Sequence, residues 1–252
     1  MGVVDELYMK NSKRIPVKED RRRRPVISMS ESIGKLNSRR MLGLIAEFKR
    51  SSPSGFKAPE GLDLKEYFSS INTAGLAGIS ILAEPEYFSG SYADIQNAQE
   101  LNLPILVKDF ISTAEMVDSS FNSGGDCILL ISDFLEHRKM SELYDYARNL
   151  GMDVIIEFHD VKSAVDLHSF NNAMIGYNRR NLRTLEMEPE KEGMDEILKM
   201  VNKIRILESG INGANIGSGI LRGFNGALIG SSILSGEDIP HKISQMEFVA
   251  YV

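Results

Sequence analysis

The chain has 252 residues, 42% of them hydrophobic and 25% charged, and it carries a formal net charge of −6, a composition typical of a soluble globular protein with a large core. The negative charge argues against a nucleic-acid partner, and no long uncharged apolar stretch is present to span a membrane. With a lone cysteine, Cys127, and no apolar secretory signal at the N-terminus, we expect a cytosolic protein without an internal disulfide.

Residues 1–41 differ from the rest because they are polar and contain the basic run Arg21-Arg22-Arg23-Arg24. Ser28-Met29-Ser30-Glu31 has the form of a capping box and predicts a helix that runs to about Arg40. We interpret the arginine run as a solvated surface segment. Two alternatives stay open: the run binds nucleic acid or anionic lipid, or this extension packs near a functional site and closes it.

From Leu42 onward, short apolar runs alternate with amphipathic stretches, a pattern that predicts strands alternating with helices. The predicted strands lie near residues 44–48, 78–82, 104–108, 126–131, 153–157, 173–178, 203–208 and 226–230. The predicted helices lie near residues 62–74, 91–101, 112–123, 136–149, 161–170, 190–201, 213–223 and 239–248.

Such βα alternation implies a parallel sheet with crossover helices, and eight units favour a closed (β/α)8 barrel. An open doubly wound sheet is the alternative, but it usually has fewer strands and binds ligands at one crevice. We therefore predict an α/β protein with one domain over residues 1–252. Within it, residues 1–41 form an N-terminal extension with a helix, and residues 42–252 form the barrel proper.

Five of the predicted strands end in charged or amide residues. Side chains alternate along a strand, so Ile45, Glu47 and Lys49 share one face. In these barrels functional residues lie at the C-terminal ends of the strands, so we predict that the polar strand ends meet in one site. Charges that merely begin a loop and face water would explain one or two of them, but not the set Glu47, Lys49, Lys108, Glu157, Asn178 and Glu208.

The last two predicted strands are followed by glycine loops, Ser209-Gly210 and Gly230-Ser231. Glycine lets the backbone approach an oxyanion closely, and the loops after the seventh and eighth strands of such barrels often bind phosphate. With Ser52 and Lys49 nearby across the barrel mouth, these loops favour a phosphorylated ligand.

The lysines and glutamates at the other strand ends suit acid–base chemistry on a carbonyl compound. The four histidines, at positions 137, 159, 168 and 241, are scattered and suggest no metal site, and no nucleotide-binding glycine motif is present. We expect a site without a metal or a cofactor.

The run Ile45-Ala46-Glu47-Phe48-Lys49-Arg50-Ser51-Ser52-Pro53-Ser54-Gly55 resembles the strand-one motif of indole-3-glycerol phosphate synthase, a (β/α)8 enzyme of tryptophan biosynthesis. Similar matches are Leu82-Ala83-Glu84-Pro85, Tyr87-Phe88-Ser89-Gly90-Ser91, Pro104-Ile105-Leu106-Val107-Lys108-Asp109-Phe110, Leu207-Glu208-Ser209-Gly210-Ile211 and Leu228-Ile229-Gly230-Ser231-Ser232. The resemblance covers nearly everything from about residue 42 to the C-terminus.

This resemblance implies a carboxy-lyase that closes the pyrrole ring of 1-(2-carboxyphenylamino)-1-deoxyribulose 5-phosphate and then releases CO2 and water. It implies that Lys108 is the general acid, that Lys49 pairs with the substrate carboxylate or aids dehydration, and that Glu157 serves the later proton transfers. The residues implied to position the substrate and the lysines are Glu47, Asn178 and Glu208.

The resemblance further implies that Ser52, Gly210, Gly230 and Ser231 bind phosphate, and that Ser209 and Arg180 bind the substrate or its phosphate. It implies a slot for the anthranilate ring formed by Phe88, Phe110 and Leu129, although Phe88 and Phe110 could equally be core aromatics. The implied partner is a phosphorylated small molecule, and association with other tryptophan-pathway enzymes is compatible with the resemblance. A Schiff-base aldolase using Lys108 or Lys49 and a non-catalytic phosphate-ligand-binding barrel remain the competing functions.

Overall fold

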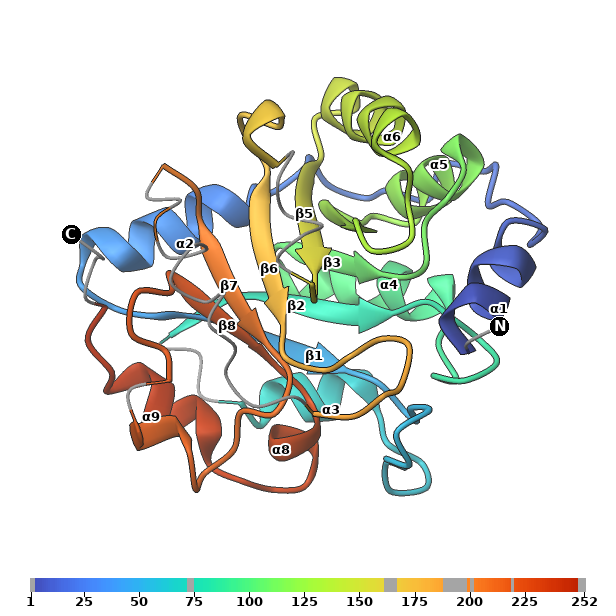
Figure 1. The fold of residues 1–252 in the computed structure, drawn as a ribbon. Helices are drawn as coiled ribbons and strands as arrows, with labels where there is room; N and C mark the ends of the chain where they lie inside the picture. Colours follow the sequence, from blue (N-terminus) through green and yellow to red (C-terminus); the bar gives the residue numbers. More distant parts are fainter. Residues whose placement is uncertain are drawn as a thin grey trace.

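The computed structural model describes residues 3–71, 75–160, 167–187, 199, 202–218 and 220–248. Eight parallel strands pair with their neighbours in chain order, and β1 also pairs with β8, so the sheet closes into a barrel (Figure 1). The strands are β1 (Gly43–Phe48), β2 (Leu76–Leu82), β3 (Ile105–Lys108), β4 (Cys127–Ile131), β5 (Asp153–Phe158), β6 (Met174–Asn178), β7 (Arg205–Glu208) and β8 (Gly226–Ile229). The predicted (β/α)8 fold and all eight predicted strands are confirmed.

The helices cover the outside of the barrel, except for two that precede the first strand. The α-helices are α1 (Val3–Asn11), α2 (Met29–Ser38), α3 (Leu64–Ser69), α4 (Tyr92–Ala98), α5 (Ala114–Asn122), α6 (His137–Asn149), α8 (Ser231–Leu234) and α9 (Ile239–Ser244). Short 3-10 turns are η1 (Gln99–Leu101), η3 (Leu167–Ser169) and η4 (Ile216–Ser218). None of the helices in the described ranges combines the length and the hydrophobicity needed to cross a lipid bilayer.

The helix predicted near 213–223 is wrong for the described residues there, which contain only η4 between turns. Gly213, Gly217 and Gly223 disfavour a continuous helix, so the N-cap that the Asn212 side chain forms with the N–H groups of Ala214 and Asn215 starts only a short turn. The helix predicted near 190–201 lies almost wholly outside the described residues, and of that predicted near 161–170 only the end is described. Helix α1 was not predicted.

The barrel has two apolar layers, as strand alternation requires. Ile45, Leu106 and Ile155 belong to the cluster inside the barrel, whereas their neighbours on the same strands belong to the cluster between the strands and the helices. The predicted inward direction of Glu47, Lys108 and Glu157, each two positions further along, therefore agrees with the packing below them.

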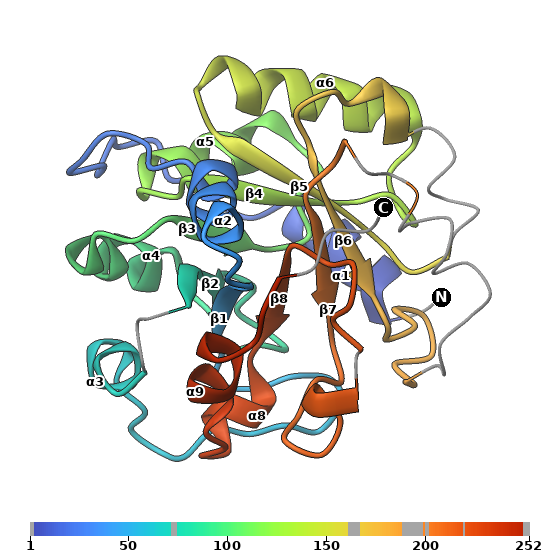
Figure 2. The same ribbon diagram turned by 90° about the vertical axis from the view of Figure 1, so that its left-hand side faces the viewer.

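The N-terminal extension closes the interior cluster at both ends. Met29 and Ile33 of α2 join this cluster at the N-terminal ends of the strands. Val4 and Leu7 of α1 join it at the C-terminal ends. Figure 2 shows α2 in front of the barrel strands and α1 behind them. The predicted cap of α2 is confirmed, because the Ser28 hydroxyl accepts from the N–H of the third helical residue.

Between the two helices the chain is extended, and its arginines alternate in environment. Arg22 and Arg24 both pair with Asp126, which precedes β4 at the N-terminal end of the barrel, with side-chain exposures of only 9% and 11%. Arg21 and Arg23 face outward, with exposures of 52% and 59%. The interpretation of the run as a solvated segment is therefore wrong for Arg22 and Arg24, which bind a buried carboxylate inside the protein.

Candidate active site

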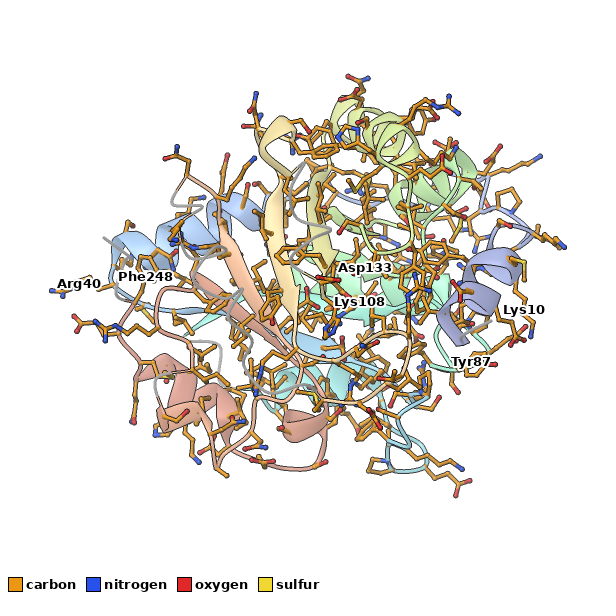
Figure 3. The ribbon with its side chains drawn as sticks, viewed as in Figure 1. Lys10, Arg40, Tyr87, Lys108, Asp133 and Phe248 are labelled. Carbon is orange, nitrogen blue, oxygen red and sulfur yellow. The ribbon has the colours of Figure 1, made fainter. Side chains whose placement is uncertain are left out.

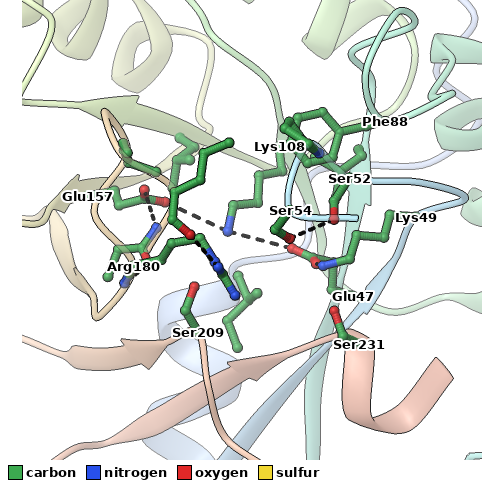
Figure 4. Close-up of a pocket in the computed structure, with 18 of the residues that line it drawn as sticks. Glu47, Lys49, Ser52, Ser54, Phe88, Lys108, Glu157, Arg180, Ser209 and Ser231 are labelled. Carbon is green, nitrogen blue, oxygen red and sulfur yellow. Dashed lines mark hydrogen bonds and ion pairs between the residues drawn. The ribbon is translucent and has the colours of Figure 1, made fainter. Parts of the chain in front are cut away.

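A cavity of about 230 Å³ lies at the C-terminal ends of the strands (Figure 4). All but one of the residues predicted for the site line it: Glu47, Lys49, Ser52, Phe88, Lys108, Phe110, Leu129, Glu157, Asn178, Arg180, Ser209, Gly210, Gly230 and Ser231. The exception is Glu208, which is fully buried behind the cavity wall. Strand ends distant in sequence thus meet around one space, as the barrel topology requires.

Lys108 lies near the centre of the molecule, where three carboxylates surround its ammonium group (Figure 3). Its Nζ is 2.6 Å from Glu208 Oε2, 3.5 Å from Glu47 Oε2 and 3.7 Å from Glu157 Oε2. Burial alone would lower the pKa of Lys108, but attraction to the surrounding carboxyl groups, that of Glu208 first, outweighs it and raises that pKa above its ordinary value. Lys108 is therefore held as an ammonium ion.

Lys49 forms the second lysine–glutamate pair of the site. Its Nζ donates to Glu47 Oε1 at 2.6 Å, so Glu47 lies between the two lysines and contacts each with a different oxygen. Burial would raise the pKa of Glu47, yet Lys49 and Lys108 together lower it. Glu47 is thus a fixed negative charge that keeps the two ammonium groups apart at the floor of the cavity.

Glu157 has a different environment, with less compensating charge. Its side chain is almost fully buried and accepts a hydrogen bond from Asn178 Nδ2 at 2.8 Å. Burial and the repulsion of Glu208 outweigh the attraction of Lys108 and raise the pKa of Glu157 to about 8. Glu157 therefore titrates near neutral pH, which suits a group that both takes up and releases protons.

The Glu208 carboxylate lies over Gly176 of β6, which has no side chain. A Cβ built on Gly176 would lie 2.4 Å from Glu208 Oε1, so any larger residue there would displace the carboxylate. Asn178, two residues further along β6, is oriented by accepting from the Arg180 N–H at its Oδ1. The amide direction toward Glu157 is thus fixed by the backbone of the following loop.

Two glycine loops form the opposite wall. Gly210 has φ of +68°, which favours glycine, and its added Cβ would lie 2.3 Å from Met187. A Cβ on Gly230 would lie 2.5 Å from Glu47 Oε1. Helix α8 begins at Ser231, directly after this glycine, so the first N–H groups of α8 lack intrahelical acceptors. Backbone donors and serine hydroxyls thus line this wall, as an anion site requires.

Arg180 contributes a further cation to the cavity wall. Its Nη1 donates to the carbonyl oxygen of Leu185, and no carboxylate in the described part of the chain pairs with it. Burial lowers the pKa of Arg180. Because the two lysines are already paired with glutamates, Arg180 is available for an anionic group of a ligand.

The apolar end of the cavity holds Phe88 and Phe110, whose ring centroids are 6.2 Å apart, together with Leu129. Phe110 is also in edge-to-face contact with Tyr8 of α1, with ring centroids 5.6 Å apart. This end could accept a flat hydrocarbon ring while the polar walls hold charged groups.

Comparison with known proteins identifies the family. The family model described as indole-3-glycerol phosphate synthase matches residues 5–246. The chain belongs to this family. It is 44% identical over 214 residues to the indole-3-glycerol phosphate synthase of Picrophilus torridus, an alignment that covers 85% of each protein.

Other members of the indole-3-glycerol phosphate synthase family are more distant. The protein from Sulfurisphaera tokodaii is 43% identical, over 75% of this chain and 76% of its own. That from Bacillus cereus is 33% identical, over 78% and 75%. Among solved structures, KGPDC from Streptococcus mutans has a TM-score of 0.59 at 10% identity, covering 81% of this chain and 97% of its own, which shows the shared fold alone.

For this synthase-family chain, sequence reasoning missed part of the cavity wall. Val4 and Leu7 of α1 line its apolar end, and Asp109 lies beside Lys108 in the wall. A signal for α1 was present, because Val4, Leu7 and Tyr8 have the spacing of one helix face. Asp109 belongs to the motif at the end of the third strand, but no neighbouring residue in the sequence indicates that its partner is Arg14 of the N-terminal extension.

Proposed function

We propose that the chain catalyses the indole-3-glycerol phosphate synthase reaction on 1-(2-carboxyphenylamino)-1-deoxyribulose 5-phosphate. The observation that carries this proposal is the ammonium of Lys108, in ion-pair range of Glu47, Glu157 and Glu208 at the floor of a cavity with an anion wall and an apolar slot. Such a site offers an acid, a base and separate places for phosphate and ring.

Ring closure is the step assigned to Lys108. As the ring carbon attacks the ribulose carbonyl, negative charge builds on the carbonyl oxygen, and a buried ammonium stabilises and then protonates it. The raised pKa of Lys108 does not prevent this transfer, because the alkoxide that forms is a far stronger base than an amine. Glu157, 3.7 Å away and largely protonated at neutral pH, can then return a proton to Lys108.

The later steps are assigned to Lys49 and Glu157. Loss of CO2 sends its electron pair into the neighbouring iminium, and loss of water then needs an acid at the departing hydroxyl and a base at the ring. Lys49 supplies the acid or the counter-charge for the substrate carboxylate, and Glu157, once ionised, supplies the base. Glu47, Asn178 and Glu208 hold these groups in place.

Phosphate binding is assigned to the glycine loops, Ser52 and Arg180, and ring binding to Phe88, Phe110 and Leu129. The phosphate lies away from the reacting atoms, so its binding energy can hold the carbonyl and the ring carbon within reach of each other. Association with other enzymes of the tryptophan pathway and location in the cytosol stay predictions from the sequence.

The direct test is a fluorescence assay of the purified protein with this substrate in buffer that contains a metal chelator. The chain has no tryptophan, so the background at indole wavelengths is low. We expect indole emission to grow with time. A flat trace with tight substrate binding would indicate a non-catalytic barrel, and a flat trace without binding would refute the substrate.

Replacing Arg180 with methionine tests the anion site separately. The substitution removes a cation that pairs with no carboxylate among the residues that the structure describes, so we expect KM to rise roughly 10- to 100-fold with a smaller change in kcat. Arg183→Met is the matched control on the same loop, because Arg183 is 60% exposed and pairs with Asp5. Equal effects of both substitutions would contradict the assignment of Arg180.

A further inference from the structure

Asp109 is a buried carboxylate directly beside Lys108 that the proposed reaction does not use. Its side chain is fully buried, although it lies at the C-terminal end of β3 in the cavity wall. Oδ2 accepts from Arg14 Nη2 at 2.5 Å, and Oδ1 accepts from Asn11 Nδ2 at 3.1 Å. Both of these side-chain donors belong to the N-terminal extension, while the barrel itself contributes the N–H of Phe110, which donates to Oδ1 at 2.8 Å.

The same arginine also binds the neighbouring strand end. Arg14 Nη1 donates to the carbonyl oxygen of Ala83, just after β2, at 3.2 Å. The N–H of Ala83 donates in turn to the carbonyl oxygen of Lys108 at 3.0 Å. Arg14, Ala83, Lys108 and Asp109 thus form a closed ring of contacts around the peptide that carries the ammonium group.

We propose that Arg14 is a positioning residue for Lys108: by neutralising Asp109 and binding the end of β2, it fixes the strand end from which Lys108 reaches its three glutamates. The proposal rests on the proposed function, in which Lys108 is the acid. Removal of Arg14 leaves Asp109 as a buried charge without its cation, and relief of that charge requires movement or protonation of the residue next to Lys108.

The position of Arg14 is fixed by contacts with several other residues. The guanidinium lies over the ring of Tyr92, 5.1 Å from its centroid, and only 18% of the side chain is exposed. Helix α1 is held against the loop after β2 by Lys10, which pairs with Glu86 at 2.7 Å, near Tyr87 in Figure 3. Arg14 is therefore placed by contacts independent of Asp109.

The N-terminal extension contains a second arginine, Arg24, that can serve as a control for the substitution of Arg14. Arg24 also pairs with a buried carboxylate, Asp126 Oδ2, at 2.7 Å, but at the opposite end of the barrel. Arg14→Met and Arg24→Met each remove one buried arginine–carboxylate ion pair from the same segment, although Asp126 keeps Arg22 as a second cation, and only Arg14→Met acts beside Lys108. A general loss of stability affects both variants, whereas a loss of positioning affects one.

The kinetic test compares Arg14→Met, Arg24→Met, Asp109→Asn and the double variant Arg14→Met/Asp109→Asn in the full chain. We expect kcat to fall about 10- to 100-fold for Arg14→Met, because misplacement by a fraction of an ångström to an ångström is costly for a proton donor. Arg24→Met should stay within about twofold of the unmodified chain at a temperature where it is folded. Inhibition by inorganic phosphate should be unchanged in all four.

The dependence of kcat on pH separates the effect of the unpaired Asp109 charge from the effect of the lost Arg14 side chain. Burial already raises the pKa of Asp109, and loss of Arg14 raises it further, so Asp109 in Arg14→Met ionises closer to neutral pH. The kcat of Arg14→Met should therefore fall further as the pH rises through this pKa, and the double variant should lack that step. Glu157 titrates in both variants, so it cancels in the comparison. The other titratable groups facing Asp109 are Tyr8, Glu84 and Tyr92.

Hydrogen exchange tests the inference without turnover. Arg14→Met should speed amide exchange in residues 108–111, at the C-terminal end of β3, and Arg24→Met should not, because its partner Asp126 binds the N–H of Ile105 at the other end of that strand. Unchanged kcat, pH profile and exchange in Arg14→Met would overturn the positioning role, as would equal losses in both arginine variants. If the unmodified chain itself fails to turn over the substrate, the proposed function falls, while the exchange experiment still decides whether Arg14 orders the end of β3.

Discussion

Replacement of Lys108 by alanine is expected to reduce kcat by about 10³-fold or more, because it removes both the proton donor and the cation facing the developing alkoxide. Inhibition by inorganic phosphate should remain nearly unchanged, since the glycine loops and Arg180 do not depend on Lys108 for a partner. The measurement is the rate of indole formation together with the inhibition constant of phosphate.

Two outcomes would contradict the assignment of Lys108 as an acid. Activity of Lys108→Ala close to that of the unmodified chain would remove Lys108 from the reaction. A covalent adduct on Lys108 after borohydride treatment with the substrate would make it a Schiff-base amine, as in the aldolase alternative. Circular dichroism of the variant controls for folding, since three carboxylates lose their shared cation.

Glu157→Gln is expected to lower kcat by roughly 10²- to 10⁴-fold, because glutamine keeps the shape and can still contact Asn178 but carries no transferable proton. The pH profile is the sharper readout. The pKa of about 8 for Glu157 predicts a change of rate near that pH in the unmodified chain, and the change should be absent from the variant. A step of equal size in Glu157→Gln would assign the titration to another group.

The raised pKa of Glu157 also affects stability, with a defined sign. The ordinary pKa of a glutamate is 4.5, and in the folded chain Glu157 titrates at about 8, so between these values the folded state binds more protons than the unfolded state. The stabilising contribution is therefore complete below the lower value and is lost as the pH rises toward the higher one. We expect Glu157→Gln to melt above the unmodified chain at about pH 9 and close to it at about pH 5.

The barrel and most of its site could be predicted because the direction of each side chain follows from its place along a strand. The parallel topology then brings all the C-terminal strand ends to one face of the barrel. Once Glu47 and Lys108 were placed two residues beyond Ile45 and Leu106, their inward direction followed without knowledge of any long-range contact. The same rules brought the glycine loops of β7 and β8 to the same face as the polar strand ends.

The extension could not be predicted in this way, because its partners are set by tertiary contacts. The run of arginines alternates between buried and exposed, and nothing near Arg22 or Arg24 in sequence indicates that both bind Asp126, about a hundred residues away. For the same reason, the pairing of Arg14 with Asp109 was not visible. Residue pattern shows which side chains share a face, but not which distant charge compensates a buried one.

The position of the extension has a consequence for the order of folding during synthesis. Residues 3–38 leave the ribosome before the barrel strands do, yet Arg14 must wait for Asp109, Ser28 for Asp153, and Asn37 for the carbonyl of Asn225, 188 residues later. Each of these contacts requires closure of a long loop, and the entropy cost of closure comes before the contact stabilises the fold. The N-terminal extension therefore acquires its full set of partners only when β8 is about to be added.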